Sequence, residues 1–506
     1  MENKLINNPL ILKLLEKYKD IWTLSHFSSL GHWDLETYMP NDGLEGRSLA
    51  LSKIATMIQD LYLNPEFIEL INKAESEDLN DYELGIIRLL KRSLKYYQKL
   101  PKEFIEEFVK TQSIATKKWK IAKDKKDFSI FLPYLEKLIE LTKKKAELLG
   151  YENHPYDALL DLYEEGLTHK KVEDYFKLIK EPIIDLIKKI KSSNEYKDSH
   201  DLEKIPYDIN KAKELNDKLL NYLHYNMDHL RIDVSAHPFT TTIGKNDTRI
   251  TTRYKEKDFA ETIGSTIHEY GHALYALQSH EDLNFTPLNG GDSMIIHESQ
   301  SRFWENFITR NKLFLEKFYN DITNLSNDLK NYSVDDIYKY FNLVKPSLIR
   351  VEADEVTYHL HVLIRYEIEK EIFENKIEPK DLPKIWNQKY KDYLGIEPTN
   401  DSEGLMQDVH WSYGSFGYFP TYSMGTSYSA YVLHLLENDL GKINELIKTK
   451  EGITKIQTWL KEKIHQHGST YLYDDLAKNK LGKEFHPKYL LDYLKNKYSK
   501  IYELDE

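Results

Sequence analysis

The chain has 506 residues, and 70 lysines and arginines stand against 82 aspartates and glutamates, which gives a formal net charge of −12 at pH 7. An acidic excess of this kind argues against a nucleic acid or an anionic membrane as the partner. The chain has no cysteine, so disulfides and thiolate metal sites are excluded, and any metal must be bound by His, Asp or Glu.

The first 22 residues form an amphipathic pattern without the basic, apolar and small-residue layout of a signal peptide. No apolar run approaches the roughly 18 residues that are needed to cross a bilayer. We therefore expect a cytoplasmic protein that has no membrane partner.

Helical periodicity dominates residues 9–230. Apolar residues recur there at three- and four-residue steps, for example Ile11, Leu14, Leu15, Tyr18 and Ile21. Glycine (20) and proline (16) are both below average usage, which favours helices. The polar stretch 191–206 indicates an exposed loop, and no linker or internal repeat divides the chain. We predict a mainly α fold and a single domain over residues 1–506, within which two lobes are compatible.

The periodicity changes near residue 232. The stretch 232–254 is rich in threonine and β-branched residues and is interrupted by Gly-Lys-Asn-Asp. This pattern predicts a β-hairpin with strands near residues 238–243 and 248–254.

Helical sequence resumes at Asp258, which is expected to be the N-cap of a helix, with Glu261 completing a capping box. Further helices are expected over residues 293–313 and 349–373. Residues 404–431 are rich in glycine, serine and aromatic residues, which indicates an ordered but adjustable loop.

The helix that begins at Asp258 contains a His-Glu-x-x-His motif, formed by His268, Glu269 and His272. Histidines four residues apart lie one turn above each other, so that both imidazoles can reach one metal ion. Zinc lowers the pKa of a bound water to about 7, and Glu269 lies beside the same face, where it can accept the proton. The motif predicts a catalytic metal site.

A catalytic zinc site needs a third protein ligand, which must come from another element. Glu298 in the helix expected over residues 293–313 is suitable, because a helix–loop–helix hairpin can return it to the histidines. The alternatives from the residues alone are His297, Glu305 and Asp292.

Arginine is used sparingly. Only 10 of the 70 basic residues are arginine, and five of these lie within about a fifth of the chain: Arg249, Arg253, Arg302, Arg310 and Arg350. Arginine is preferred where a planar fork must hold a carboxylate with two hydrogen bonds. Asp354 lies one turn after Arg350 and is expected to orient it within a helix.

Several ordered motifs resemble those of the zinc metallocarboxypeptidases of the carboxypeptidase Taq type. The matching segments are Trp33–Pro40 (WDxxTxMP) with Gly43 and Arg47, His237–Phe239 (HPF), Asp247–Thr251 (DxRxT), His297–Gln300 (HES-Q), Ile349–Asp354 (IRxxAD) and Gly404–Trp411 (GxxQDxHW). Several motifs in one order along the whole chain are far more specific than any single motif.

The resemblance implies a two-lobed helical fold with a deep groove, like that of neurolysin-type metallopeptidases, and a small antiparallel β-sheet by the active site. It implies removal of single amino acids from the C-termini of peptides, with broad specificity. It also implies a homodimer and one Zn²⁺ per subunit, for which Co²⁺ can substitute.

The resemblance also assigns roles to residues. Glu298 is expected to be the third metal ligand and Glu269 the general base, while His410 or Tyr422 stabilises the oxyanion. The free C-terminal carboxylate of the substrate is expected to bind Arg350 or, as the second candidate, Arg249. The remaining residues expected to bind substrate are His237, Gln407 and Asp408.

Two other functions remain compatible with these motifs. An endo-acting metallo-oligopeptidase can carry a similar His-Glu-x-Gly-His motif. A peptide-binding scaffold without catalytic activity can retain the groove, although an intact Glu269 argues against it.

Overall fold

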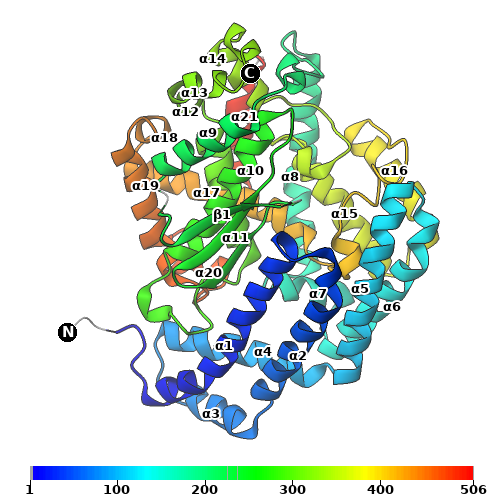
Figure 1. Ribbon diagram of the computed structural model, residues 1–506, viewed down its shortest axis with the longest axis vertical. Coiled ribbons are helices and arrows are strands. Elements are labelled where there is room, and N and C mark those ends of the chain that lie inside the picture. Colours follow the sequence, from blue (N-terminus) through cyan, green and yellow to red (C-terminus); the bar gives the residue numbers. More distant parts are fainter. Residues whose placement is uncertain (1–3, 225, 236, 505–506) are drawn as a thin grey trace. The chain divides into compact units, whose positions relative to one another are not determined.

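Helices make up most of the structure, as predicted (Figure 1). The computed structural model describes residues 4–224, 226–235 and 237–504. The chain divides into two compact units, which are described separately: unit 1 comprises residues 1–98, 201–341 and 432–485, and unit 2 comprises residues 99–200, 342–431 and 486–506. Within the described ranges, no helix is long and apolar enough to cross a membrane.

Unit 1 contains a three-stranded sheet and most of the helices. Its helices are α1 (Pro9–Thr37), α2 (Leu44–Tyr62), α3 (Pro65–Glu75), α4 (Asp81–Lys99), α9 (Ile209–Tyr222), α10 (Phe259–Leu277), α11 (Met294–Arg302), α12 (Lys312–Lys317), α13 (Tyr319–Thr323), α14 (Val334–Phe341), α18 (Ile443–Leu446), α19 (Lys450–Lys463) and α20 (Tyr473–Asn479). Helix α17 (Phe419–Leu440) begins in unit 2 and ends in unit 1.

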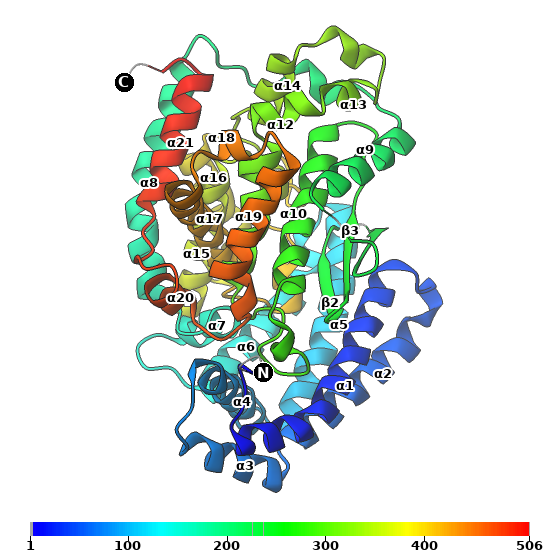
Figure 2. The ribbon, with the colours of Figure 1, turned by 90° about the vertical axis from the view of Figure 1, so that its left-hand side faces the viewer.

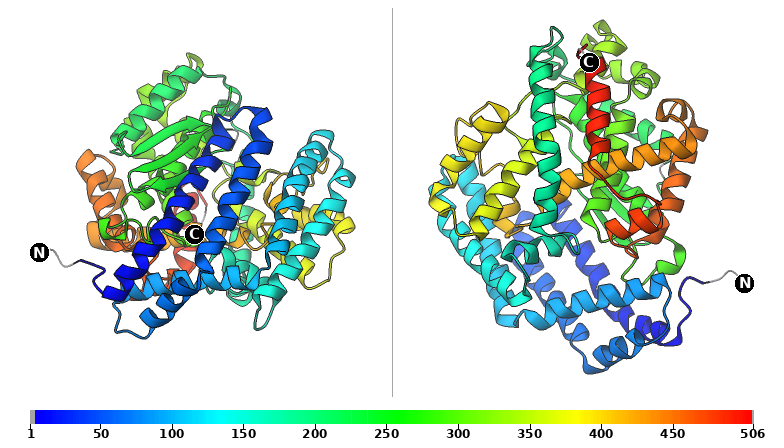
Figure 3. Two further views of the ribbon diagram at one scale, coloured as in Figure 1. Left: turned by 60° about the horizontal axis from the view of Figure 1, so that its bottom comes forward. Right: turned by 180° about the vertical axis from the view of Figure 1, so that it is seen from behind.

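Helix α1 shows how periodicity and capping define these helices. Asn8 accepts hydrogen bonds from the amides of Leu10 and Ile11, and Pro9 occupies the first helical position, where its missing N–H costs nothing. The apolar positions predicted to face the core are all buried: Ile11, Leu14, Leu15, Tyr18 and Ile21. Helix α2 lies alongside α1 (Figure 3).

Unit 2 is helical. Its helices are α5 (Lys102–Lys125), α6 (Leu132–Leu149), α7 (Pro155–Tyr163), α8 (His169–Ser192), α15 (Tyr358–Phe373), α16 (Leu382–Leu394), α21 (Lys488–Ile501) and the beginning of α17. The C-terminal helix α21 packs along α8, although the two are far apart in the sequence (Figure 2).

The sheet is mixed, which corrects the prediction of an antiparallel sheet. Strands β2 (Thr240–Gly244) and β3 (Asp247–Thr252) form the predicted hairpin, with Thr241 opposite Arg249. Strand β1 (Leu230–Val234), which was not predicted, pairs with β3 in parallel, so the strand order is β1-β3-β2. A parallel neighbour needs no adjacent turn and therefore leaves no hairpin signal in the sequence.

Helix α10 begins where predicted, but the predicted capping box is wrong. Asp258 has a φ of 64°, in the left-handed region, and its side chain makes no capping hydrogen bond. Its Oδ1 instead accepts a hydrogen bond of 2.5 Å from the hydroxyl of Tyr340. An N-cap side chain reaches the first amides from an extended backbone, which Asp258 does not have.

The helix predicted over residues 293–313 is interrupted. Helix α11 continues into a π-helical segment, Phe303–Thr309, in which the amide of Arg310 bonds the carbonyl of Glu305 five residues earlier. Asn311 then caps the separate helix α12. The wider π turn changes which residues share a face, and periodicity did not reveal it.

Two further boundaries differ from the predictions. The helix expected from residue 349 begins only at Tyr358, and Arg350 lies in a short 3₁₀ turn, Arg350–Glu352. The loop expected over residues 404–431 ends early, because α17 already begins at Phe419.

Candidate metal centre

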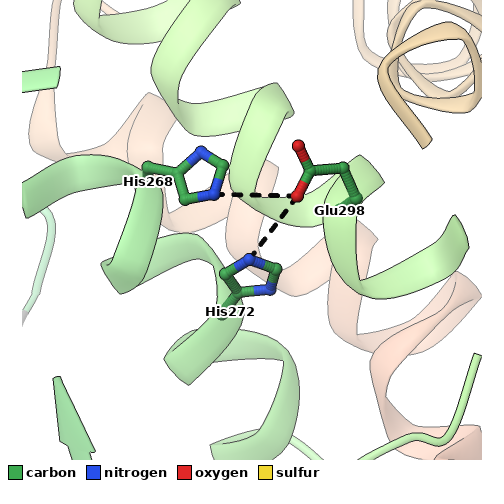
Figure 4. Close-up of side chains that lie close together, drawn as sticks. All are labelled: His268, His272 and Glu298. Atoms are coloured by element: carbon green, nitrogen blue, oxygen red, sulfur yellow. Dashed lines mark ion pairs between the residues drawn. The ribbon is translucent and has the colours of Figure 1, made fainter. Parts of the chain in front are cut away.

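Helix α10 brings His268 and His272 onto one face, and Glu298 of α11 points at both (Figure 4). The Oε2 atom of Glu298 lies 3.7 Å from the Nε2 atom of each imidazole. One ligand atom from each of the three residues lies within 4.8 Å of the other two. The structure therefore brings together the two histidines of the motif and the favoured third residue.

A glycine permits this approach of the two helices. A Cβ atom at Gly271 would lie 2.6 Å from the carbonyl oxygen of Gln300 and 2.6 Å from the Cα of Ser301. Only glycine avoids that overlap, so Gly271 lets the backbone of α11 approach the motif. This is why Glu298 lies within reach of the imidazoles.

The Nδ1 atom of His268 lies 2.9 Å from Oε2 of Glu305, which is buried. Glu305 also accepts hydrogen bonds from Arg302 (3.0 Å) and Arg310 (3.1 Å). Burial opposes ionisation, but these two arginines and His268 outweigh it and hold the pKa of Glu305 far below its usual value. The ionised Glu305 therefore accepts the Nδ1–H of His268, and Nε2 is the ring nitrogen that faces Glu298.

His272 is oriented by another histidine. Its Nδ1 lies 3.3 Å from Nδ1 of His297, whose Nε2 lies 2.9 Å from the carbonyl oxygen of Gly290 and 3.3 Å from that of Gly291. One proton arrangement satisfies all these partners: His297 donates from Nε2 and accepts the Nδ1–H of His272. Burial is the main cause that lowers the pKa of His272, and neighbouring positive charges lower it further. The His272 ring is therefore neutral and its Nε2 lone pair is free.

Two of the alternative third ligands thus lie behind the histidines. Glu305 and His297 contact the Nδ1 atoms, on the opposite side of each ring from the Nε2 atoms that face Glu298. Glu298 is itself oriented, because its Oε1 accepts a hydrogen bond of 2.7 Å from Nε of Arg302. Two imidazole nitrogens and one carboxylate oxygen converge here, and this set of donor atoms fits a divalent cation such as zinc.

Glu269 lies beside this group and is 7% exposed. Its Oε2 accepts a hydrogen bond of 2.6 Å from the hydroxyl of Thr240, on the edge strand β2. Burial raises the pKa of Glu269, although His268 and Thr240 act in the opposite direction. A carboxyl group with a raised pKa is suited to accepting and returning a proton.

A family model described as carboxypeptidase Taq (M32) metallopeptidase matches residues 13–498. The chain belongs to this family. Its members are metallocarboxypeptidases, which hydrolyse peptide bonds and require a divalent metal, and the residues just described provide a fitting site. The scaffold interpretation is thereby set aside.

Individual relatives of this carboxypeptidase Taq family member match over nearly their whole length. Thermostable carboxypeptidase 1 of Pyrococcus furiosus is 45% identical over 98% of this chain and 99% of its own. Carboxypeptidase 1 of Bacillus subtilis is 44% identical over 95% of this chain and 97% of its own.

Solved structures of carboxypeptidases have the same fold as this chain. A Pyrococcus furiosus carboxypeptidase superposes with a TM-score of 0.95 at 45% identity, covering 98% of this chain and all of its own. The M32 carboxypeptidase of Deinococcus radiodurans superposes with a TM-score of 0.93 at 28% identity, again covering 98% of this chain and 100% of its own.

In unit 2, Arg350 forms a buried cluster with Asp408. The Nε and Nη2 atoms of Arg350 donate to Oδ1 of Asp408 at 3.0 and 2.9 Å. Oδ2 of the same carboxylate accepts a hydrogen bond of 2.7 Å from Nε of Arg365, which is fully buried. Gln407 accepts a hydrogen bond of 2.8 Å from the backbone amide of Arg350. Gln407 and Asp408 thus hold Arg350.

The expectation that Asp354 orients Arg350 within one helix is wrong. Asp354 accepts hydrogen bonds of 2.9 Å from the amides of Val356 and Thr357, and so organises the start of α15. The 3₁₀ turn places Arg350 outside that helix, which removes the assumed one-turn spacing.

His410 and Tyr422 belong to the same cluster in unit 2. The Nε2 atom of His410 lies 3.2 Å from the hydroxyl of Tyr422, and the guanidinium of Arg350 lies 4.7 Å from the centre of the Tyr422 ring. Burial lowers the pKa of His410 to about 3; Arg350 and Arg365 act in the same direction and Asp408 against it. His410 is therefore neutral at physiological pH.

The other predicted substrate-binding residues lie in unit 1. Arg249 donates to both carboxylate oxygens of Asp247 (2.7 and 2.9 Å), and its guanidinium lies 4.5 Å from the centre of the Trp33 ring. His237 lies in the turn before β2, where its carbonyl accepts a hydrogen bond of 2.5 Å from Ser235. Arg249 thus already has a carboxylate partner within its own strand.

Sequence reasoning missed Thr240 and Arg365, and it named Glu305 and His297 only as rival ligands. The Arg302 and Arg310 cluster around Glu305 was visible as local arginine enrichment. The partners of Thr240 and Arg365 lie 29 and 43 positions away in the chain, and no local pattern connects them.

Proposed function

We propose that the chain is a metal-dependent carboxypeptidase that hydrolyses the C-terminal peptide bond of peptides and releases single amino acids with broad specificity. The observation that carries the proposal is the convergence of His268, His272 and Glu298, with Glu269 beside them. Relatives that match nearly the whole chain are named carboxypeptidases. We expect residues 1–506 to act as one catalytic domain.

In this proposal, the Nε2 atoms of His268 and His272 and a carboxylate oxygen of Glu298 bind one Zn²⁺ per subunit, for which Co²⁺ can substitute. Two imidazoles and a carboxylate form a known ligand set of catalytic zinc sites. The bound ion supplies Lewis acidity, which lowers the pKa of a water molecule and polarises the scissile carbonyl.

Glu269 is the general base in this proposal. Its carboxylate accepts a proton from the attacking water and then returns it to the leaving amine nitrogen. The hydrogen bond from Thr240 fixes the carboxylate, and the raised pKa brings the group closer to the pH at which it must transfer a proton in both directions.

We assign stabilisation of the oxyanion to His410 or Tyr422. Both can donate a hydrogen bond while uncharged, because burial keeps His410 neutral. They contact each other at 3.2 Å, so that one side chain can support the other.

We propose that Arg350 binds the free carboxylate of the substrate. Arg249 is only the second candidate, because its guanidinium already donates two hydrogen bonds to Asp247. Gln407 and Asp408 then contribute by holding Arg350. For His237 we retain a contact with the substrate backbone.

The homodimer and the cytoplasmic location stay predictions. Light scattering of the purified protein tests whether it is a homodimer.

Product analysis on a matched set of peptides tests the proposal. The set consists of one pentapeptide as the free acid, as the C-terminal amide, and with both ends blocked. Enzyme loaded with Zn²⁺ or Co²⁺ is expected to shorten the free acid by one residue at a time and to leave the amide intact. Internal cleavage of the doubly blocked peptide would instead identify an endo-acting oligopeptidase.

A further inference from the structure

Two buried guanidinium groups in unit 2 share one carboxylate. Arg350 is 5% exposed and Arg365 is fully buried, and both pair with Asp408. Among the described residues, neither arginine forms an ion pair with any other carboxylate. Two positive charges and one negative charge leave a net charge of +1. A net charge of this kind is costly away from water unless an anion joins it.

No nearby carboxylate among the described residues forms a second ion pair with this cluster. Glu369 lies one turn after Arg365, but its carboxylate accepts hydrogen bonds from other groups: Tyr156 (2.6 Å), Trp411 (2.8 Å) and the amide of Gly417 (2.8 Å). Lys123 donates to the carbonyl of Gln407 at 2.9 Å and adds a further positive charge. The cluster therefore remains electropositive.

Arg350 also keeps hydrogen-bonding capacity. A guanidinium has five N–H groups in a rigid fork. Among the described residues, Arg350 donates two of them to Oδ1 of Asp408 and one to the hydroxyl of Tyr358 at 3.2 Å. Two N–H groups remain, which is the number that a second carboxylate needs for a bidentate contact.

We propose that Arg365 is a positioning residue for recognition of the substrate carboxylate. By pairing with Oδ2 of Asp408, it fixes the carboxylate against one edge of Arg350 and prevents Asp408 from neutralising that guanidinium completely. The ligand is the α-carboxylate of a peptide. The inference rests on the proposed carboxylate-binding role of Arg350.

Charge balance gives the test, made on the metal-loaded enzyme with a free-acid peptide. The net charge of Arg350, Arg365 and Asp408 together is +1 in the wild type. Arg365→Gln lowers this net charge to zero, and the double variant Arg365→Gln with Asp408→Asn returns it to +1. We expect Arg365→Gln to raise KM about tenfold or more while kcat changes by less than about threefold. The double variant should return KM part of the way to the wild-type value, because it restores the charge of the cluster but removes the carboxylate that holds Arg350.

An inhibition readout separates this role from a purely structural one. N-acetylphenylalanine and its amide differ only in the terminal group, which is an anionic carboxylate in one and an uncharged amide in the other, so Arg365→Gln should weaken inhibition by the acid and not by the amide. Lys389→Gln is the matched control, since it removes a largely buried cation that pairs with Glu367 and Glu371 elsewhere in unit 2. It should leave KM and both inhibition constants unchanged.

The outcomes distinguish the two levels of the proposal. If Arg350→Gln leaves KM for free-acid peptides unchanged, Arg350 does not bind the substrate carboxylate, and Arg365 then has no positioning role. If Arg350→Gln raises KM but Arg365→Gln does not, or if the double variant is worse than Arg365→Gln alone, only the positioning role of Arg365 is overturned.

Discussion

The Nδ1 atom of His268 lies 2.9 Å from a carboxylate oxygen of Glu305, and Arg302 and Arg310 hold that carboxylate from two sides. A carboxylate behind a metal-binding imidazole fixes the ring and increases its basicity. Glu305→Gln should therefore weaken Zn²⁺ binding by about 10- to 100-fold, as measured by competition with a chromophoric chelator.

The control for that variant is Glu316→Gln, on the exposed face of α12. It removes the same charge from the same part of the chain and should leave the dissociation constant unchanged. Equal metal affinity in the Glu305→Gln protein and the wild type would contradict the role of Glu305.

His297 gives a second prediction about the metal. It is the acceptor for the Nδ1–H of His272, so His297→Leu leaves that imidazole free to rotate or to change tautomer. We expect faster release of Zn²⁺ to excess chelator, by about tenfold or more. An unchanged release rate in a folded variant would show that His272 is oriented by packing alone.

Glu269→Gln separates metal binding from proton transfer. Glutamine can still accept the hydrogen bond from Thr240 but cannot accept a proton, so the rate should fall by roughly 10²- to 10⁴-fold or more while bound zinc stays near one equivalent. Turnover and metal content are measured on the same preparation. A near-normal rate would require a different general base.

Two glycines of α10 give opposite predictions for stability. Alanine at Gly271 overlaps the α11 backbone and should lower the free energy of unfolding by about 1–3 kcal/mol and weaken metal binding. Alanine at Gly264, where the added Cβ would meet no atom within 4 Å apart from its chain neighbours and the backbone of its own helix, should raise the free energy of unfolding by about 0.5–1 kcal/mol. Urea unfolding of both variants measures the difference, and equal effects would contradict the close approach at Gly271.

The pH dependence of stability has a specific source in unit 2. Burial raises the pKa of Glu369 from 4.5 to about 7, although the donors Tyr156 and Trp411 and the amide of Gly417 act in the opposite direction. Because the pKa of Glu369 is higher in the folded than in the unfolded state, its protonation stabilises the fold. This contribution to the free energy of unfolding is complete below pH 4.5 and is lost as the pH rises through 7. The contribution is about 3 kcal/mol. Unfolding free energies measured at pH 5 and 7 should differ less in Glu369→Gln than in the wild type; an equal pH difference would contradict this source.

Local sequence determined the helical character of the chain, the β2–β3 hairpin and the residues of the metal motif. Each depends on contacts between near neighbours: the 3.6-residue period sets the buried face of α1, and the four-residue spacing sets His268 above His272. The choice of Glu298 over its rivals came from family resemblance, because helical spacing alone does not say which acid of a second helix faces the first.

Only the tertiary structure decided which side chains support the site. The parallel strand β1, the π turn that carries Glu305, the left-handed Asp258 and the pairing of Asp408 with both Arg350 and Arg365 all depend on packing between segments distant in the sequence. Such contacts follow from the burial of whole helices and from the need to pair buried charges. The 3.6-residue period shows which face of a helix is buried but not which segment covers it, and a buried charge pair leaves no local pattern, so these partners emerge only when the chain is folded.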